Sequence, residues 1–188
     1  AVSKTFKIDK ILPLIEEGHK DFGENKVQEA LDKWSDIKLQ KPNIRLHLLG
    51  GLQTNKVKFA VKIFDFIHSV DSIKLAKKIS DEQIRQKKNI KIFIQVNLGN
   101  EKQKSGIAKS ELDSLFSYCK DIGLNIIGLM CIPPVGLDPV SFFKELKILN
   151  DSLSLSELSM GMSSDYVEAI EQHATYLRIG SEIFGKRD

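Results

Sequence analysis

The sequence has few of the residues that mark disulfide-bonded, metal-binding or membrane-spanning proteins. Only two cysteines occur among the 188 residues, Cys119 and Cys131, and their spacing suits no metal site. Both lie in apolar stretches, which favours small core residues over redox or metal-binding thiols. No apolar run approaches the roughly 18 residues that indicate a membrane-spanning helix. We therefore expect no metal and no membrane partner, in a reducing compartment.

The sequence also has only a small excess of one sign of charge. The chain has 28 Lys and Arg against 25 Asp and Glu, a formal net charge of +3, which is too small to demand a nucleic-acid or membrane partner. The lysines between positions 74 and 91 make a locally basic stretch, but no aromatic residues interleave with them to stack on bases. A solvated helix face explains them better. Because no signal peptide is present, we expect a cytoplasmic protein.

The chain also lacks an initiator methionine and opens on what looks like the end of a strand. We therefore expect that an upstream segment is missing. At 188 residues the chain is long enough for one well-buried domain and short for two. The prediction is a single domain over residues 1–188.

What the sequence does contain is a regular alternation of short apolar runs and amphipathic segments. Eight apolar runs each end in a polar or glycine-containing cluster, and seven amphipathic segments separate them. The runs end within residues 1–4, 21–25, 46–51, 66–69, 93–97, 128–130, 158–163 and 177–181. This alternation is typical of a (β/α)8 barrel, in which the chemistry lies at the carboxyl ends of the strands.

The amphipathic segments have the spacing of helices. Apolar residues at i, i+3, i+4 and i+7 give a helix one apolar stripe. The spacing is strict in residues 8–15, 27–34, 57–64, 112–119 and 166–173, and looser in 73–84 and 142–149. The strand runs are continuously apolar rather than alternating, as in 91–96, which suits strands buried on both faces of a parallel sheet.

Alternating strands and helices form either a closed barrel or an open doubly wound sheet. Eight strands favour closure, and no G-x-G-x-x-G follows the first strand, which weakens a dinucleotide-binding fold. We therefore predict an α/β fold, a single (β/α)8 TIM barrel. Its eighth helix would come from the missing upstream segment or from a short turn around Glu182–Phe184.

Three features at predicted strand ends could carry chemistry. Lys4 follows the first strand, where partial burial in the barrel mouth would lower the pKa of its amine and favour a Schiff base. Residues 159–165 and 178–181 place glycines and serines after the last two strands, which is the usual phosphate site of this fold. Ser163 or Ser164 could also cap a helix. Arg178 interrupts an apolar run and could face a ligand ring, where it would keep a pyridine nitrogen unprotonated.

A lysine, a phosphate site and an arginine at one barrel mouth indicate pyridoxal 5'-phosphate (PLP), and further motifs agree. These are Ala1–Thr5, Phe22–Asn25 with Gln28–Ala30, Leu52–Lys56, His68–Ser72, Gln95–Asn97, Lys104–Gly106, Gly128–Met130, Leu158–Ser163 and Arg178–Ser181 with Phe184–Gly185. In this order, along nearly the whole chain, they resemble the pyridoxal phosphate homeostasis protein family (YggS/PROSC type). That family is known as a carrier or regulator of this vitamin B6 cofactor, with no established turnover.

The resemblance implies a PLP fold-type III-like barrel that lacks the C-terminal β domain of alanine racemases and has a helix before its first strand. It implies that PLP is held as a covalent aldimine on Lys4. Ser163, Gly180 and Ser181 would surround the phosphate, and Arg178 would lie near the pyridine nitrogen. The remaining implied cofactor-binding residues, expected to line the mouth, are Asn25, His47 and Met130.

Two residues depart from the family pattern, both expected near the mouth of the third strand. Leu46 stands where the family has tryptophan, and Gly51 stands where it has histidine, which puts the role of that loop in doubt. Among the other histidines, we expect His173 to pack on its helical stripe and His19 to lie at the bottom of the barrel. His68 would either reach the mouth or bond to its own loop.

Two enzymatic functions compete with a PLP carrier. An amino-acid racemase of this barrel type would use the same lysine and arginine, but it needs a second base, and the three tyrosines fall on helices or at a strand start. A PLP-free Schiff-base aldolase would need an acid–base partner, for which Glu24 is the nearby candidate. We expect a monomeric PLP-binding protein with negligible turnover, with free amino acids and apo PLP enzymes as further candidate partners.

Overall fold

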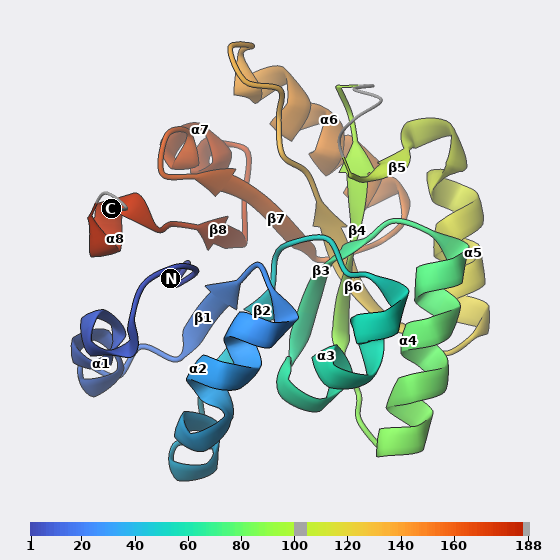
Figure 1. Cartoon of the computed structure of the whole chain (residues 1–188). Coiled ribbons are helices and arrows are strands. Elements are labelled where there is room, and N and C mark those ends of the chain that lie inside the picture. Colours follow the sequence, from blue (N-terminus) through green and yellow to red (C-terminus); the bar gives the residue numbers. More distant parts are fainter. Residues whose placement is uncertain (100–104, 186–188) are drawn as a thin grey trace.

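The computed structural model describes residues 1–99 and 105–185, which form a barrel of parallel strands surrounded by helices (Figure 1). The strands are β1 (Asp21–Glu24), β2 (Arg45–Leu48), β3 (Phe66–Val70), β4 (Lys91–Asn97), β5 (Ile107–Ala108), β6 (Asn125–Met130), β7 (Glu157–Met162) and β8 (Tyr176–Arg178). Their hydrogen-bonded order is β1-β2-β3-β4-β6-β7-β8, and the short β5, which the sequence pattern did not predict, pairs with β4. The predicted α/β TIM barrel is confirmed.

The first residues of the chain close the barrel between β1 and β8. Val2 forms an isolated parallel bridge with Gly23 of β1, and its backbone N–H donates to the carbonyl oxygen of Ile179 at 2.6 Å. The strand predicted over residues 1–4 is thus reduced to one bridge, in which Val2 pairs with Gly23. Lys4 follows this bridge at the carboxyl end of the barrel. The helix expected upstream stays a prediction.

The helices follow the predicted amphipathic segments. They are α1 (Ile8–Glu16), α2 (Val27–Gln40), α3 (Val57–Ile63), α4 (Ile73–Gln86), α5 (Leu112–Asp121), α6 (Pro139–Ser152), α7 (Tyr166–Glu171) and α8 (Ser181–Phe184), with short 3-10 turns η1 (Thr54–Lys56) and η2 (Lys109–Glu111) before α3 and α5. The start of α4 is capped by Ser72, whose hydroxyl accepts from the Leu75 N–H at 3.4 Å. The short α8 occupies the place of the turn predicted after the last strand.

Side chains along the strands alternate between two buried layers, as the pleat requires. In β2, Leu46 and Leu48 pack in the main core between the sheet and the helices, and His47 between them faces the barrel interior. A separate apolar cluster of Phe66, Phe93 and Met130 fills that interior. Only the inward-facing residues can line or support a site within the barrel.

The helix predicted over residues 166–173 is shorter than its apolar stripe. Helix α7 ends at Glu171, and His173 lies in the following turn with φ +66° and an exposed side chain. Of the stripe, only Ala169 is fully buried, and Ile170 is 53% exposed. The interpretation of His173 as a packing residue is therefore wrong, because the chain turns back toward β8 before the stripe is complete.

Both cysteines lie in the core, as predicted. Burial raises the pKa of the Cys119 and Cys131 thiols to about 12, so neither is a reactive thiolate.

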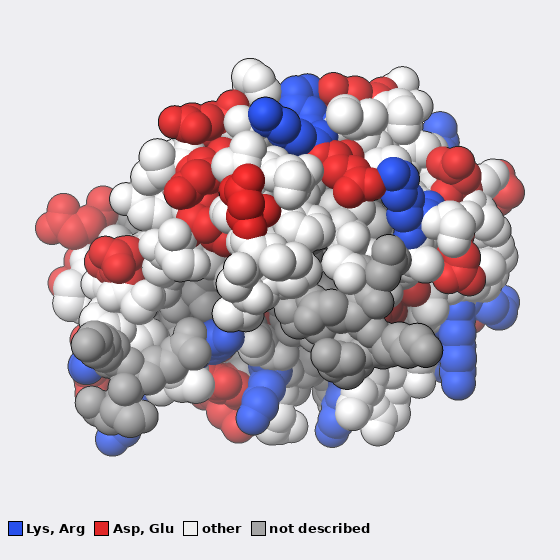
Figure 2. Space-filling view, turned by 90° about the horizontal axis from the view of Figure 1, so that it is seen from above, with Lys and Arg blue, Asp and Glu red and all other residues white. Residues whose placement is uncertain are grey.

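Within residues 1–99 and 105–185 there is no group of three or more side chains suited to hold a metal ion. Over the same residues, no helix has the length and apolar character needed to cross a membrane. Figure 2 shows acidic and basic side chains interspersed over the face toward which β4 runs.

Candidate functional site

A cavity opens at the carboxyl ends of the strands, between the first residues of the chain and the loops after β7 and β8. It encloses about 320 Å³, near the lower end of the range for small-molecule sites. Its lining consists of Val2, Lys4, Asn25, Leu49, Ile132, Met162, Ser163, Ser164, Arg178, Gly180 and Ser181. Six of the eight residues predicted for the site are in this set, and they come from both ends of the sequence.

The other two predicted residues, His47 and Met130, do not line this cavity. Met130 is fully buried in the interior cluster with Phe66, and the His47 ring stacks on Phe66 with 4.1 Å between centroids. His47 pairs in register with Gly23 of β1, two residues before Asn25. Since inward residues form successive layers, His47 lies one layer below the mouth. These two side chains therefore do not line this cavity, and their expected part in cofactor binding stays a prediction.

The backbone that carries Lys4 is held by a buried cluster under α2. The Ser3 hydroxyl donates to Oε1 of Glu24 at 2.8 Å, and the Lys33 ammonium donates to the Ser3 carbonyl at 2.9 Å. Glu24 Oε1 also accepts from Lys33 and from the Trp34 indole, each at 2.9 Å. The fully buried Glu24 is thus engaged by α2 and is not part of the cavity lining. Through its bond to Ser3 it holds the segment that carries Lys4 in place.

The loops after β7 and β8 meet at the cavity. The Gly180 N–H donates to the Ser163 hydroxyl at 3.3 Å, and α8 begins at the next residue, Ser181. The alternative that Ser163 or Ser164 caps α7 is not observed, since over the described residues no side chain caps that helix. Asp165 instead accepts from the Met162 N–H at 2.6 Å and closes the turn. The hydroxyl groups of Ser163 and Ser164 are thus not used to cap α7.

Arg178 lies at the base of the cavity. Its guanidinium is buried and donates to the Ser159 hydroxyl at 3.0 Å and to the Cys131 carbonyl at 2.8 Å. Burial lowers the pKa of Arg178 from its ordinary value, against which Cys131 and Asp165 act electrostatically. A guanidinium remains protonated in proteins. The site therefore has a fixed cation with two of its donors already committed.

The loop after β2 forms another wall of the mouth. A side chain at Gly50 would place its Cβ 2.3 Å from the Asn25 carbonyl oxygen, so only glycine permits this close approach. At Gly51 the nearest atom to such a Cβ would be the Ser105 hydroxyl, at 3.8 Å, which leaves open space beside the cavity. Leu46, the other departure from the family pattern, is packed in the outer core. Its expected place near the mouth is wrong, because the strand pleat turns it toward the helices.

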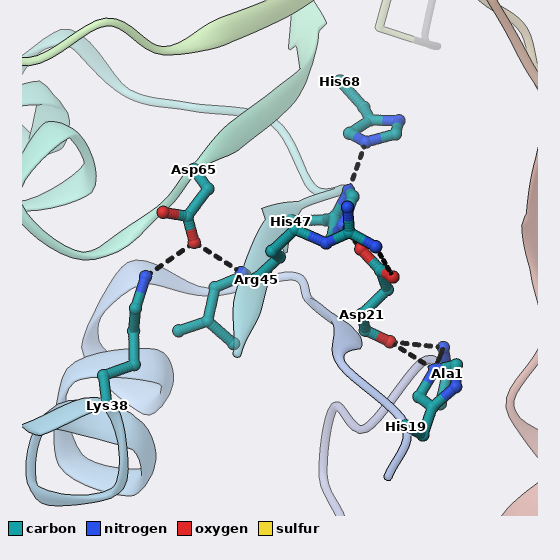
Figure 3. A network of polar contacts seen from close by, with 9 residues as sticks. Ala1, His19, Asp21, Lys38, Arg45, His47, Asp65 and His68 are labelled. Atoms are coloured by element: carbon teal, nitrogen blue, oxygen red, sulfur yellow. Dashed lines mark hydrogen bonds and ion pairs between the residues drawn. The ribbon is translucent and has the colours of Figure 1, made fainter. Parts of the chain in front are cut away.

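Polar side chains continue below the cavity through the barrel interior (Figure 3). The two rings of His47 and His68 are joined at 3.0 Å, and His47 Nε2 meets a carboxylate oxygen of Asp21 at 3.0 Å. Arg45 pairs with the same carboxylate. His68 neither reaches the mouth nor bonds to its own loop; its Nδ1 lies 2.8 Å from the Ser159 hydroxyl. Sequence reasoning missed this role of His68 and Ser159, although both are polar residues within apolar strand runs.

The fold and cavity place this protein among barrels related to alanine racemase. The profile of the family described as "Alanine racemase, N-terminal domain" matches residues 1–188. The alanine racemase of Clostridium difficile 630 superposes with a TM-score of 0.76 at 12% identity, over 99% of this chain and 51% of that chain. At this identity the likeness concerns the fold alone.

Relatives of higher sequence identity show to which family within this class the protein belongs. The pyridoxal phosphate homeostasis protein of Aquifex aeolicus is 37% identical over 195 residues, which cover 98% of this chain and 85% of that protein. That of Vibrio alginolyticus is 36% identical over 199 residues, with coverage of 100% and 85%. PipY of Synechococcus elongatus PCC7942, solved with PLP bound, has a TM-score of 0.92 at 35% identity, over 98% of this chain and 91% of that one. The chain belongs to the pyridoxal phosphate homeostasis protein family, as its sequence motifs predicted.

Proposed function

We propose that this protein binds PLP reversibly on Lys4 and serves PLP homeostasis as a carrier or regulator. One observation carries the proposal: a single cavity collects Lys4, the serines and glycine of two neighbouring loops, and the buried Arg178. Relatives that match 98–100% of this chain are named for PLP homeostasis, and PipY, which shares this fold, has been solved with PLP bound.

The lining residues fit the three functional parts of the cofactor. The Lys4 amine would hold the aldehyde carbon covalently. Ser163 accepts the Gly180 N–H, which leaves its own hydroxyl hydrogen for a phosphate oxygen, and Ser181 would add donors from the start of α8. Arg178 would lie near the ring nitrogen, where it can only donate. Lysine, serine hydroxyls and arginine are the groups that a phosphorylated pyridine aldehyde needs.

The same residues favour binding over turnover. PLP, when bound, can act as an electron sink for an amino-acid substrate. Arg178 opposes protonation of the ring nitrogen by like-charge repulsion, which weakens that sink. Along the described lining, Lys4 and Arg178 are the only side chains with an ionisable group, and no tyrosine occurs there. A second base for racemisation is therefore not supplied by the described part of the cavity.

The alternatives receive less support. Tyr166 lies on the surface of α7, and Tyr176 packs against the interior rings of His47 and His68, so neither is placed as the second base of a racemase. The aldolase alternative relied on Glu24, which the α2 cluster engages. That the protein is monomeric and cytoplasmic, and that free amino acids and apo PLP enzymes are its further partners, stay predictions.

Absorption spectroscopy of the purified protein with added PLP tests the proposal. We expect a Schiff-base band that borohydride abolishes, and peptide mapping should then find the pyridoxyl group on Lys4. Lys4→Ala should lose the covalent adduct and keep the fold, because a half-buried mouth lysine contributes little packing. Lys56→Ala, which changes an exposed lysine of η1, is the matched control. A pyridoxyl group found chiefly on Lys56 or on Lys104, which lies outside the described residues, would contradict the assignment.

A further inference from the structure

A continuous chain of hydrogen bonds crosses the barrel interior from Arg178 to Asp21. Its links are Arg178 Nη1 to Ser159 Oγ (3.0 Å), Ser159 Oγ to His68 Nδ1 (2.8 Å), His68 Nε2 to His47 Nδ1 (3.0 Å) and His47 Nε2 to Asp21 Oδ1 (3.0 Å). Ser159, His68 and His47 are 0%, 1% and 5% exposed. The part from His68 to Asp21 is visible in Figure 3. The chain joins the base of the cavity to the opposite end of the barrel.

With both histidine rings neutral, the two ends of this hydrogen-bond chain fix the direction of every hydrogen bond in it. A guanidinium only donates and an ionised carboxylate only accepts. Ser159 therefore accepts from Arg178 and gives its single hydrogen to His68 Nδ1. His68 must carry its hydrogen on Nε2 and donate to His47 Nδ1. His47 must likewise carry its hydrogen on Nε2 and donate to Asp21.

The surroundings keep both rings neutral. Burial lowers the pKa of His68 well below its ordinary value, and His47 and Arg178 add to this. Burial also lowers the pKa of His47, against the opposing effect of Asp21. The other titratable groups near His47 are Arg45 and the chain's terminal amine, and the Tyr176 ring packs against both histidines.

Ring packing holds the two histidines in the geometry that the series of hydrogen bonds requires. The His68 ring stacks on Phe93 at 4.3 Å between centroids, as His47 does on Phe66. A ring fixed in this way presents Nδ1 of His68 to the Ser159 hydroxyl in one orientation. That hydroxyl and the Cys131 carbonyl are the two acceptors that fix the plane of the Arg178 guanidinium. A functional group is positioned best when the side chains behind it are themselves locked.

We propose that His68 and Ser159 are positioning residues that orient Arg178 toward the ring of the bound cofactor, an inference that rests on the proposed PLP function. The proposed role of His68 is exerted through Ser159 and needs no contact with the cofactor. It directs the lone pair of Ser159 toward Arg178 by taking the hydroxyl hydrogen. The role of His47 and Asp21 is to fix the tautomer of His68.

A double-mutant cycle on PLP affinity tests whether Ser159 acts through Arg178. The dissociation constant of PLP is measured by absorption titration for the wild type, Ser159→Ala, Arg178→Met and the double variant. We expect Ser159→Ala to weaken binding about tenfold, or about 1.4 kcal/mol, when Arg178 is present. In the Arg178→Met background, we expect Ser159→Ala to weaken PLP binding less than twofold. Equal factors in the two backgrounds would overturn the inference.

A matched pair at position 68 separates positioning from structural support. Asn at this position keeps an acceptor near the place of Nδ1, whereas Leu keeps only the apolar bulk. We expect His68→Asn to bind PLP several-fold more tightly than His68→Leu. A merely structural role gives the opposite order, because a buried amide with unmet hydrogen bonds costs stability. Thermal unfolding of the PLP-free variants records that stability, and equal or reversed affinities would contradict the proposal.

The tautomers can be read directly in the PLP-free wild-type protein. Long-range ¹H–¹⁵N spectra of histidine-labelled protein near neutral pH should show His68 and His47 as neutral rings protonated on Nε2. A ring protonated on Nδ1, or a charged ring, would contradict the proposed directions of the hydrogen bonds, whether or not PLP binds. A wild-type protein that takes up no PLP would refute the proposed function itself. PLP binding combined with an additive cycle would refute the positioning role alone.

Discussion

The Gly180 N–H and the Ser163 hydroxyl, 3.3 Å apart, tie the loop after β7 to the loop after β8. Ser181 follows at the start of α8, and all three residues line the same cavity. This contact holds the two loops together where we propose that the phosphate binds. Because a phosphate is negatively charged, we expect this end of the proposed site to be sensitive to an added negative charge.

Ser181→Asp should therefore weaken PLP binding by at least about tenfold, since it sets a carboxylate against the phosphate and removes a donor whose bond to a charged group is worth about 1.5–3 kcal/mol. The dissociation constant is measured by absorption titration. Ser35→Asp adds the same charge on the exposed side of α2 and should leave the affinity unchanged. Unchanged affinity in a folded Ser181→Asp protein would count against the assigned phosphate position.

The neighbouring glycines of the loop after β2 should respond differently to alanine. Gly50→Ala forces a Cβ to within 2.3 Å of the Asn25 carbonyl oxygen, whereas at Gly51 the nearest atom is 3.8 Å away. Since backbone must move in the first case only, we expect Gly50→Ala to lose about 1–3 kcal/mol of stability and to bind PLP more weakly. Gly51→Ala should match the wild type in urea unfolding and PLP titration. Similar behaviour of both variants would show that Asn25 is not held by this contact.

Asp21 should make stability fall in acid. Partial burial alone would raise the pKa of Asp21, but hydrogen bonds from His47 and Arg45 outweigh it and lower the pKa to about 2 from 3.8. A depressed pKa in the folded state means that the ionised form contributes stability above the unfolded value, and that this contribution is lost as pH falls from about 4 to about 2.

Urea unfolding of the wild type and Asp21→Asn at several pH values measures this effect. The difference in unfolding free energy between the two proteins should be largest above about pH 4 and should shrink toward pH 2. Because Asp21 is partly exposed, salt should reduce the difference. A difference that stays constant through this pH window would show that Asp21 does not titrate as assigned.

Amino-acid turnover should be negligible in the PLP-loaded protein. Arg178 weakens the electron sink, and the described lining offers no second base. Racemase, transaminase and decarboxylase assays should give rates far below the roughly 10 s⁻¹ typical of enzymes. Free amino acids should nevertheless compete with Lys4 for the cofactor and shift its absorption band. A turnover number near the enzymatic median would favour the racemase alternative over the carrier.

The local pattern of the sequence was sufficient to predict the barrel and to place several of the candidate residues at strand ends. Helical stripes and continuously apolar strands depend on nearest neighbours along the chain, so their positions could be read directly. Lys4 and the loops around Ser163 and Arg178 lie at strand ends, and a parallel barrel brings all of its strand ends to one face. Their grouping in one cavity therefore followed from the fold class, whereas the assignment of Asn25 came from the family resemblance.

Only the tertiary structure decided which face of each strand a residue occupies and at which depth it lies. A shift of one residue in strand register exchanges the inner and outer faces, and continuously apolar runs contain no marker of that choice. Leu46 therefore turned out to pack outward, and His47 lies a layer below the mouth. The contact of His68 with Ser159, 91 residues apart in sequence, depends on the closure of the whole barrel, which no local segment specifies.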